Sequence, residues 1–388
     1  MLAHGLYPLL QDSIKRANCA FWQKRGAGPD GEIGPLAQPP VSFVLRADSA
    51  PTLLPPPFAP PARYLAVAAI TGFVAALAGT GGVHFGGAAG TAFLGAAVLL
   101  TGMPHGAVDH LVAQRLFDLR GPRGAGLFYG AYLAAAALYG LVWLVAPAGA
   151  LALFLLMAAY HFGQADLAYL APRSRGARTG LYLSRGAFVV GGAPAAHPQA
   201  VAPLVEAVGG FAPLEAAPVL AEAPLIMLAG LAAQHALVLA VRAGTEGSGR
   251  SLRWMGREAC SLVLLTVLFG AAPPLVGFAV YFGLWHALGH VFVLLRFFRA
   301  AGAEGERSYP VTGAAFYRRA AAYTVLPLVG LAAFVGLTAP PGRTLPPMLD
   351  ALAALFVLIS VLTLPHMLLV ERLYRRERER MKKRPREE

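Results

Sequence analysis

Long apolar runs separated by short polar segments recur along most of the chain after residue 62. A helix needs about 17–25 mainly apolar residues to cross the hydrocarbon core of a bilayer. Runs of this length predict ten helices, at 63–80, 87–116, 126–146, 150–171, 179–195, 224–242, 258–271, 275–298, 319–338 and 348–372. Because the fifth and seventh are short, we predict an all-α, polytopic helical membrane protein with about eight to ten transmembrane helices.

The distribution of polar residues divides the chain into three parts. Residues 1–61 contain proline-rich stretches such as PTLLPPPFAPPAR and no long apolar run, so we expect a flexible or disordered leader. Residues 62–374 form the predicted helical transmembrane domain, which carries all the candidate chemistry described below. Residues 375–388 are predicted to form a basic cytoplasmic tail.

Charge supports the membrane interpretation and fixes an expected orientation. Charged residues make up 13% of the chain, against about a quarter in soluble proteins. Lys and Arg gather at 114–124, 172–178, 242–257, 296–309 and in the tail. Since cytoplasmic loops are enriched in these residues, we expect a multi-pass protein of the cell inner membrane with both termini in the cytoplasm. The net charge of +12 then reflects topology and contact with anionic lipid, and no nucleic-acid partner is expected.

Five histidines lie inside the predicted apolar helices beside motif-like neighbours: His105, His161, His286, His290 and His366. Ionisable groups in membrane spans are costly and usually face the interior of a helix bundle, so each is a functional candidate. Each histidine lies six to twelve residues before the basic residue at the cytoplasmic end of its helix, or about 9–18 Å at 1.5 Å per residue. We therefore expect the five imidazoles to share one layer of the membrane.

The spacing of two of these histidines favours a shared metal ion. His286 and His290 are four residues apart, so both can point from one helix face at a single atom. His105 and His161 would complete an all-imidazole set. Imidazole binds Zn, Cu, Fe and Ni, so the ligand type does not choose among them. Interhelical hydrogen bonding is the alternative, and it stays fully open for His366.

Two carboxylates accompany the histidines. Asp109 follows His105 by four residues, and Asp166 follows His161 by five. Metal-bound imidazoles usually donate their second N–H to a carboxylate or carbonyl group. Both aspartates, together with His366, are therefore candidates for residues that contact the ligands without binding the metal themselves. Alternatively, each aspartate is solvated near a helix end or paired with an arginine.

Four motifs carry a resemblance to a known family. PHGAVDH at 104–110, HFGQAD at 161–166, YFGLWHALGH at 281–290 and LPH at 364–366 occur in this order. Over roughly 63–375 the chain resembles the Brp/Blh family of membrane β-carotene 15,15′-dioxygenases. Family members often have a small hydroxylated residue where this chain has Ala287.

The resemblance implies a reaction, a cofactor and partners. It implies oxidative cleavage of the central double bond of β-carotene by dioxygen to two all-trans-retinal molecules. The implied cofactor is Fe(2+), held by the histidines that match the family's ligands: His105, His161, His286 and His290. β-Carotene, dioxygen, membrane lipid and a retinal-binding rhodopsin are the implied partners.

Aromatic residues crowd the same layer of the membrane. Tyr160, Phe162, Tyr281 and Trp285 are candidates for walls that contact a long, flat polyene. Packing and interfacial anchoring are the ordinary roles of such residues in membrane proteins.

Other classes of membrane protein also use intramembrane histidines. Di-iron desaturases and hydroxylases need HxxHH clusters, and no HxxHH occurs in this sequence. A haem-carrying electron-transfer protein would use two facing imidazoles and leave the others unexplained. A transporter would be expected to show broken helices or charged residues near the midplane.

Overall fold

The computed structural model describes residues 69–70, 88–170, 172, 174–245, 248–303, 309–338 and 347–383. Within these residues every regular element is a helix, and seven helices are long and apolar enough to cross a membrane. The described chain is thus an all-α polytopic membrane protein, which confirms the predicted class. The predicted leader, residues 1–61, lies outside the described residues.

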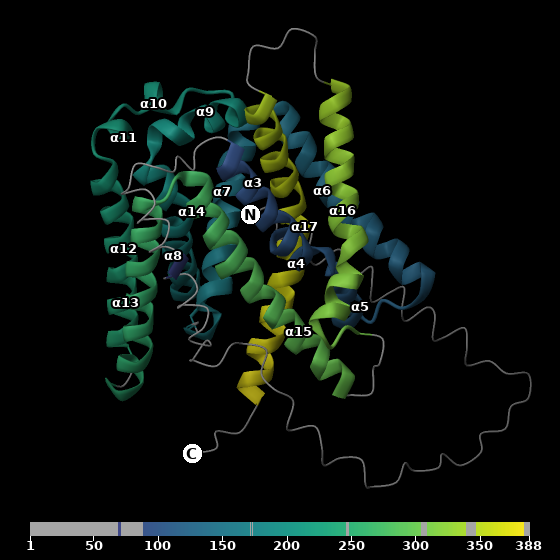
Figure 1. Cartoon of the computed structure of the whole chain (residues 1–388). Helices are drawn as coiled ribbons and strands as arrows, with labels where there is room; N and C mark the ends of the chain where they lie inside the picture. The colour runs from purple at the N-terminus through teal and green to yellow at the C-terminus, as the bar shows by residue number, and fades with distance from the viewer. Residues whose placement is uncertain are drawn as a thin grey trace, which may run out of the picture. The chain divides into compact units, whose positions relative to one another are not determined.

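The first half of the described chain contains nine elements (Figure 1). They are α3 (Ala88–Ala97), the π-helical η2 (Val98–Gly102), α4 (Met103–Ala107), α5 (Asp109–Phe117), α6 (Gly121–Val145), α7 (Pro147–Leu167), the 3-10 turn η3 (Ala168–Leu170), α8 (Arg175–Ala196) and α9 (Pro198–Gly209). Proline stands in the first turn of α6, α7 and α9, where its fixed φ suits a helix and its missing N–H costs nothing.

The second half contains nine more elements (Figure 1). They are α10 (Pro213–Ala216), α11 (Val219–Glu222), α12 (Pro224–Gly244), α13 (Ser248–Ala271), α14 (Pro274–Ala279), the π-helical η4 (Val280–Ala287), α15 (Leu288–Ala303), α16 (Gly313–Thr338) and α17 (Pro347–Lys383). Helices α14, η4 and α15 follow one another without a loop, so His286 and His290 lie on one continuous helical segment.

The helices differ from the predicted ones mainly at their ends. The seven membrane-length helices found among the described residues are fewer than the eight to ten predicted. The predicted helix 63–80 lies outside the described residues, apart from Ala69 and Ile70. Helix α13 begins ten residues before the predicted 258, and α17 continues past 372 to Lys383. Polar turns that extend a helix beyond its apolar part escape a search for apolar runs.

Two glycines bring α7 and α8 into backbone contact. A Cβ atom placed on Gly163 would lie 1.8 Å from the carbonyl oxygen of Tyr182, and one on Gly186 would lie 1.7 Å from that of Ala159. Small residues permit such close approach between membrane helices. The contact fixes the height of α7, and therefore of His161, against α8.

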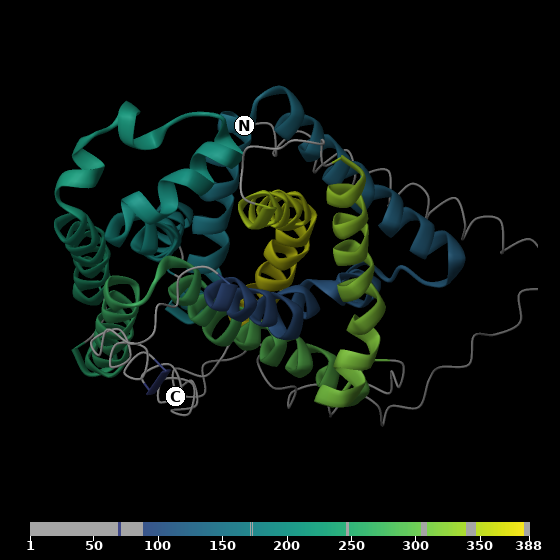
Figure 2. The ribbon, with the colours of Figure 1, turned by 45° about the horizontal axis from the view of Figure 1, so that its top comes forward.

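Helix α17 is surrounded by other helices of the bundle. It contacts α5, α6, α7, α9 and α16, and Figure 2 shows its surroundings. Large apolar side chains on the outward faces of the surrounding helices are exposed, as lipid contact requires: Leu144 on α6, Ile226 on α12 and Leu326 on α16 are more than two-thirds exposed.

Candidate metal centre and membrane cavity

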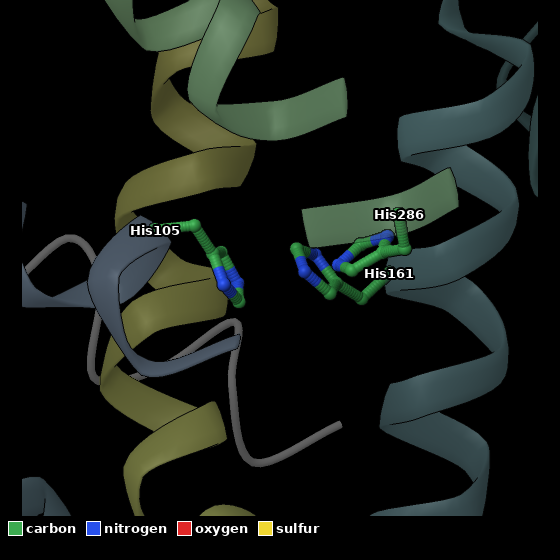
Figure 3. Close-up of side chains that lie close together, drawn as sticks. All are labelled: His105, His161 and His286. Carbon is green, nitrogen blue, oxygen red and sulfur yellow. The ribbon is translucent and has the colours of Figure 1, made fainter. Parts of the chain in front are cut away.

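Five helical segments bring the five predicted histidines into one cluster. His105 lies on α4, His161 on α7, His286 on η4, His290 on α15 and His366 on α17, and their exposed fractions are 2–7%. Ring centres are separated by 4.9 Å for the closest pair and by 6.5 Å for the i, i+4 pair. Figure 3 shows His105 facing His161 and His286 across the cluster. The expectation of a single histidine layer is thus met by direct ring contacts.

Most ring nitrogens of the cluster have no hydrogen-bond partner within the described part of the chain. Both nitrogens of His161, His286 and His290 are buried and unpartnered, as is Nε2 of His366. Buried polar atoms are normally hydrogen-bonded, and leaving them unpaired is costly. A cation bound among these rings would supply a partner for one nitrogen of each ring that binds it.

The spacing of the rings suits one metal ion. His105, His161 and His286 each offer one ring nitrogen within 4.8 Å of the others. An imidazole nitrogen lies about 2.0–2.1 Å from bound zinc, which places the ring centre about 3.2 Å away and two opposite rings about 6.4 Å apart. The ring-centre separations, from 4.9 to 6.5 Å, lie at or below about that distance, as expected for rings around one ion. The residues therefore fit a metal that accepts imidazole ligands.

His366 is held by a carboxylate on a different helix. Its Nδ1 lies 3.0 Å from both carboxylate oxygens of Asp109, and Tyr132 donates its hydroxyl to Asp109 at 3.1 Å. This arrangement fixes the imidazole tautomer and leaves Nε2 free to face the cluster. The His366 ring centre is 5.0 Å from that of His105 and 5.2 Å from that of His161. His366 therefore lies within the histidine cluster itself rather than behind it.

Asp166 has different partners from those expected for an imidazole support. It accepts hydrogen bonds from Arg185 at 2.9 Å, Trp285 at 3.2 Å and Tyr281 at 3.4 Å. Five residues on a helix correspond to about 140° of rotation, so Asp166 and His161 point to different sides of α7. The arginine pairing considered from sequence is the one found.

One of the four predicted substrate-contacting aromatics lines the cavity described below. Phe162 does so, with its ring centre 4.5 Å from that of His286. Tyr160 instead donates its hydroxyl to Glu371 at 3.1 Å. Tyr281 and Trp285 are bound to Asp166, and all three lie outside the lining of that cavity. The physical reason is that a buried tyrosine or tryptophan needs a partner for its polar hydrogen.

A cavity of about 920 Å³ adjoins the histidine cluster. His105, His161, His286 and His366 form part of its wall, and most of the remaining lining is apolar. Apolar side chains come from α7, α9, α14 and α17, and they include Phe154, Leu204, Phe278 and Phe356. The contribution of α9 was missed from sequence because residues 196–223 read as a loop. Tyr132 and Arg185 were also missed, since neither lies in a histidine motif.

Fold and site together define a multi-pass membrane protein in which a histidine cluster of metal-binding dimensions borders an apolar cavity. Residues 96–374 match the family model described as beta-carotene 15,15'-dioxygenase. The chain is also 30% identical over 325 residues to the probable beta-carotene 15,15'-dioxygenase Blh of Halobacterium salinarum, covering 76% of this chain and 88% of that protein. No solved structure shows a significant match. The chain belongs to the β-carotene 15,15′-dioxygenase family.

Proposed function

We propose that the chain cleaves the central 15,15′ double bond of β-carotene with dioxygen and releases two molecules of all-trans-retinal. The observation that carries the proposal is the group of buried, unpartnered imidazole nitrogens in the wall of an apolar cavity. Membership of the family supports the same reaction. The reaction balances without added electrons, because each of the two separated carbon atoms takes one oxygen atom.

Fe(2+) is the proposed cofactor, with His105, His161, His286 and His290 as its ligands. When bound, iron(II) would supply the activation of dioxygen that protein side chains cannot provide. The Nε2 atom of His366 lies in the same cluster and is a candidate for a further ligand position. Four or five neutral ligands leave the charge of the ion uncompensated. Its retention would therefore depend on the number and placement of the imidazoles, because no carboxylate ligand attracts it.

The residues of the cavity bind and orient the substrate. β-Carotene has no polar group, so an apolar wall excludes water and holds the polyene by contact alone. Phe162 and Phe282 lie beside His286, with ring centres 4.5 and 6.1 Å from the imidazole, and both line the cavity. We propose that they place the central double bond against the histidine cluster.

The predicted setting of the enzyme follows from its helices and charges. The apolar helices support a multi-pass protein, and we propose the cell inner membrane with both termini in the cytoplasm. Substrate then enters from the lipid in which it dissolves. We further propose that the retinal passes to a rhodopsin, and that the basic tail contacts anionic lipid.

Production of the chain in a β-carotene-accumulating bacterium tests this function. We expect loss of orange colour and appearance of all-trans-retinal in extracts separated by liquid chromatography. Membranes that contain the protein while the cells keep their carotene and lack retinal would contradict the proposal.

A single-metal centre is favoured over the di-iron class. Among the described residues, one group of histidines, His105, His161 and His286, has the spacing of a metal site, and His290 and His366 lie in ring contact with it. A desaturase-like or hydroxylase-like enzyme would bind two irons per chain. A haem or transport protein would leave the carotene intact, so the same colour assay separates these alternatives.

A further inference from the structure

Arg185 forms a fully buried ion pair close to the metal centre. Its side chain on α8 is 1% exposed and that of Asp166 is 5% exposed, with Nε and Oδ2 2.9 Å apart. Arg185 also donates from Nη2 to Ser261 on α13 at 2.8 Å. Burying two charges in a membrane protein is costly, and ionisable residues at such depth are usually retained for function.

Asp166 connects two of the segments that carry histidines. It lies on α7 with His161, and it accepts hydrogen bonds from the indole N–H of Trp285 at 3.2 Å and the hydroxyl of Tyr281 at 3.4 Å, both on η4. Trp285 directly precedes His286. The ring centres of His161 and His286 are 4.9 Å apart, and Figure 3 shows the two rings close together opposite His105.

The segment that Asp166 holds has an uncommon conformation. Residues Val280–Ala287 form a π-helix, and such segments are rare and often occur at functional sites. The wider turn changes the direction of every side chain that follows it. The direction in which the His286 side chain points therefore depends on contacts that stabilise this turn, and Tyr281 and Trp285 provide two of them.

We propose that Arg185, Asp166, Tyr281 and Trp285 form a buried brace that sets the position of His286 relative to His161. Arg185 is a positioning residue: it fixes the Asp166 carboxylate, whose two oxygens then hold the indole and the phenol of η4. The proposal rests on the proposed metal site. It gives Tyr281 and Trp285 a part in metal retention instead of substrate contact.

If Arg185 only neutralises a buried charge, the variants are expected to behave differently. In that case Arg185 compensates the charge of Asp166, and the hydrogen bonds to η4 contribute nothing to the metal site. The double variant Trp285→Phe/Tyr281→Phe separates the two roles, because it removes both donors on η4 and leaves the ion pair intact.

The matched control makes the same chemical change elsewhere in the protein. Tyr139→Phe/Trp143→Phe removes a buried hydroxyl that donates to the carbonyl oxygen of Ala150 at 2.8 Å. It also removes an indole N–H, that of Trp143, with no hydrogen-bond partner within the described residues. Both residues of the control lie on α6, which carries none of the five clustered histidines.

The experiment measures Fe(II) and Co(II) binding to the full-length purified chain, with the Co(II) absorption spectrum as a probe of ligand geometry. We expect the brace variant to bind both ions about 10–100-fold more weakly than wild type and to show a changed Co(II) spectrum. The control variant should match wild type in both respects. If the double variant folds poorly, the single variants Trp285→Phe and Tyr281→Phe replace it. Each must then change the Co(II) spectrum in the same direction.

Two outcomes are distinguishable. A folded brace variant with wild-type affinity and an unchanged spectrum overturns the brace. Failure of the wild-type protein to bind either ion overturns the proposed metal site itself, whatever the variants do.

Discussion

A buried histidine in this protein is distinguished by the side chains around it as much as by its burial. His366 has Asp109 behind Nδ1 and the cluster in front of Nε2. His235 is also buried, and its Nε2 is likewise unpartnered within the described residues, but its Nδ1 lies 3.0 Å from the hydroxyl of Ser184 and its ring stacks on Phe188 instead of another imidazole. Two buried imidazoles with different neighbours therefore lead to opposite expectations for mutation.

Replacing His290 with alanine should abolish metal retention and carotene cleavage together. The change removes one imidazole from a centre that has no carboxylate ligand to compensate. Metal content of the purified variant and retinal formation in cells check this. His235→Ala is the control and should leave both near wild-type values; equal losses in the two variants would contradict a specific ligand role.

Asp109→Asn should weaken metal binding while the protein stays folded. Asparagine keeps the shape and an acceptor for the Nδ1–H of His366, but it loses the charge that makes the imidazole a stronger ligand. We expect about 10–100-fold weaker Fe(II) binding, measured by competition with a chelator. Asp118→Asn is the matched control, because that aspartate is exposed and bonded to Arg120. Wild-type affinity in the Asp109 variant would show that the carboxylate is not needed.

At the scale of elements, the close contact of α7 and α8 sets the height of His161. We expect Gly186→Ala to push the two helices apart, because its Cβ would overlap the backbone of Ala159. Overpacking of this kind costs about 1–3 kcal/mol or more. The unfolding temperature in detergent should fall by several degrees, and metal retention should fall with it.

Gly180→Ala on the same helix is the control for this contact. Nothing lies within 4 Å of its would-be Cβ, so alanine should leave stability unchanged or slightly raised by its better helix propensity. If both alanine variants have the unfolding temperature of wild type, the contact does not limit the approach of the helices.

The positions of the apolar helices could be read from the sequence, whereas their internal irregularities could not. Length and hydropathy located the helices that became α6, α7, α12 and α17. The π-helical turn of η4 has the same apolar composition as its neighbours, so nothing in the sequence marks it. Helix α9 was missed because its prolines and its position between two membrane spans suggest a loop.

The candidate site was predictable as a layer and less so as a set of contacts. Counting residues to the cytoplasmic end of each helix placed the five imidazoles at one depth, and the structure brings them together. The partners of Asp109 and Asp166 depend on how helices rotate against each other. Packing across distant helices decides that rotation, so His366 and Arg185 could not be assigned from spacing within one helix.

At the scale of the whole molecule, the cavity joins the histidine cluster to helices far from it in sequence. We expect Leu204→Trp on α9 to reduce retinal formation strongly while leaving the metal content unchanged, since it fills the cavity without touching a histidine. Leu237→Trp is a suitable control, because Leu237 lies on the outward face of α12 and is 65% exposed. Full activity of the Leu204 variant would place the substrate elsewhere.

The central claim is that imidazoles from separate helices share one ion inside the membrane domain. X-ray absorption at the iron edge of the purified, iron-loaded protein tests it most directly. We predict about one iron per chain, surrounded by nitrogen and oxygen at about 2.0–2.2 Å, with the outer-shell scattering of several imidazoles. An iron–iron distance, a haem spectrum, or an iron that lacks imidazole scattering would contradict it.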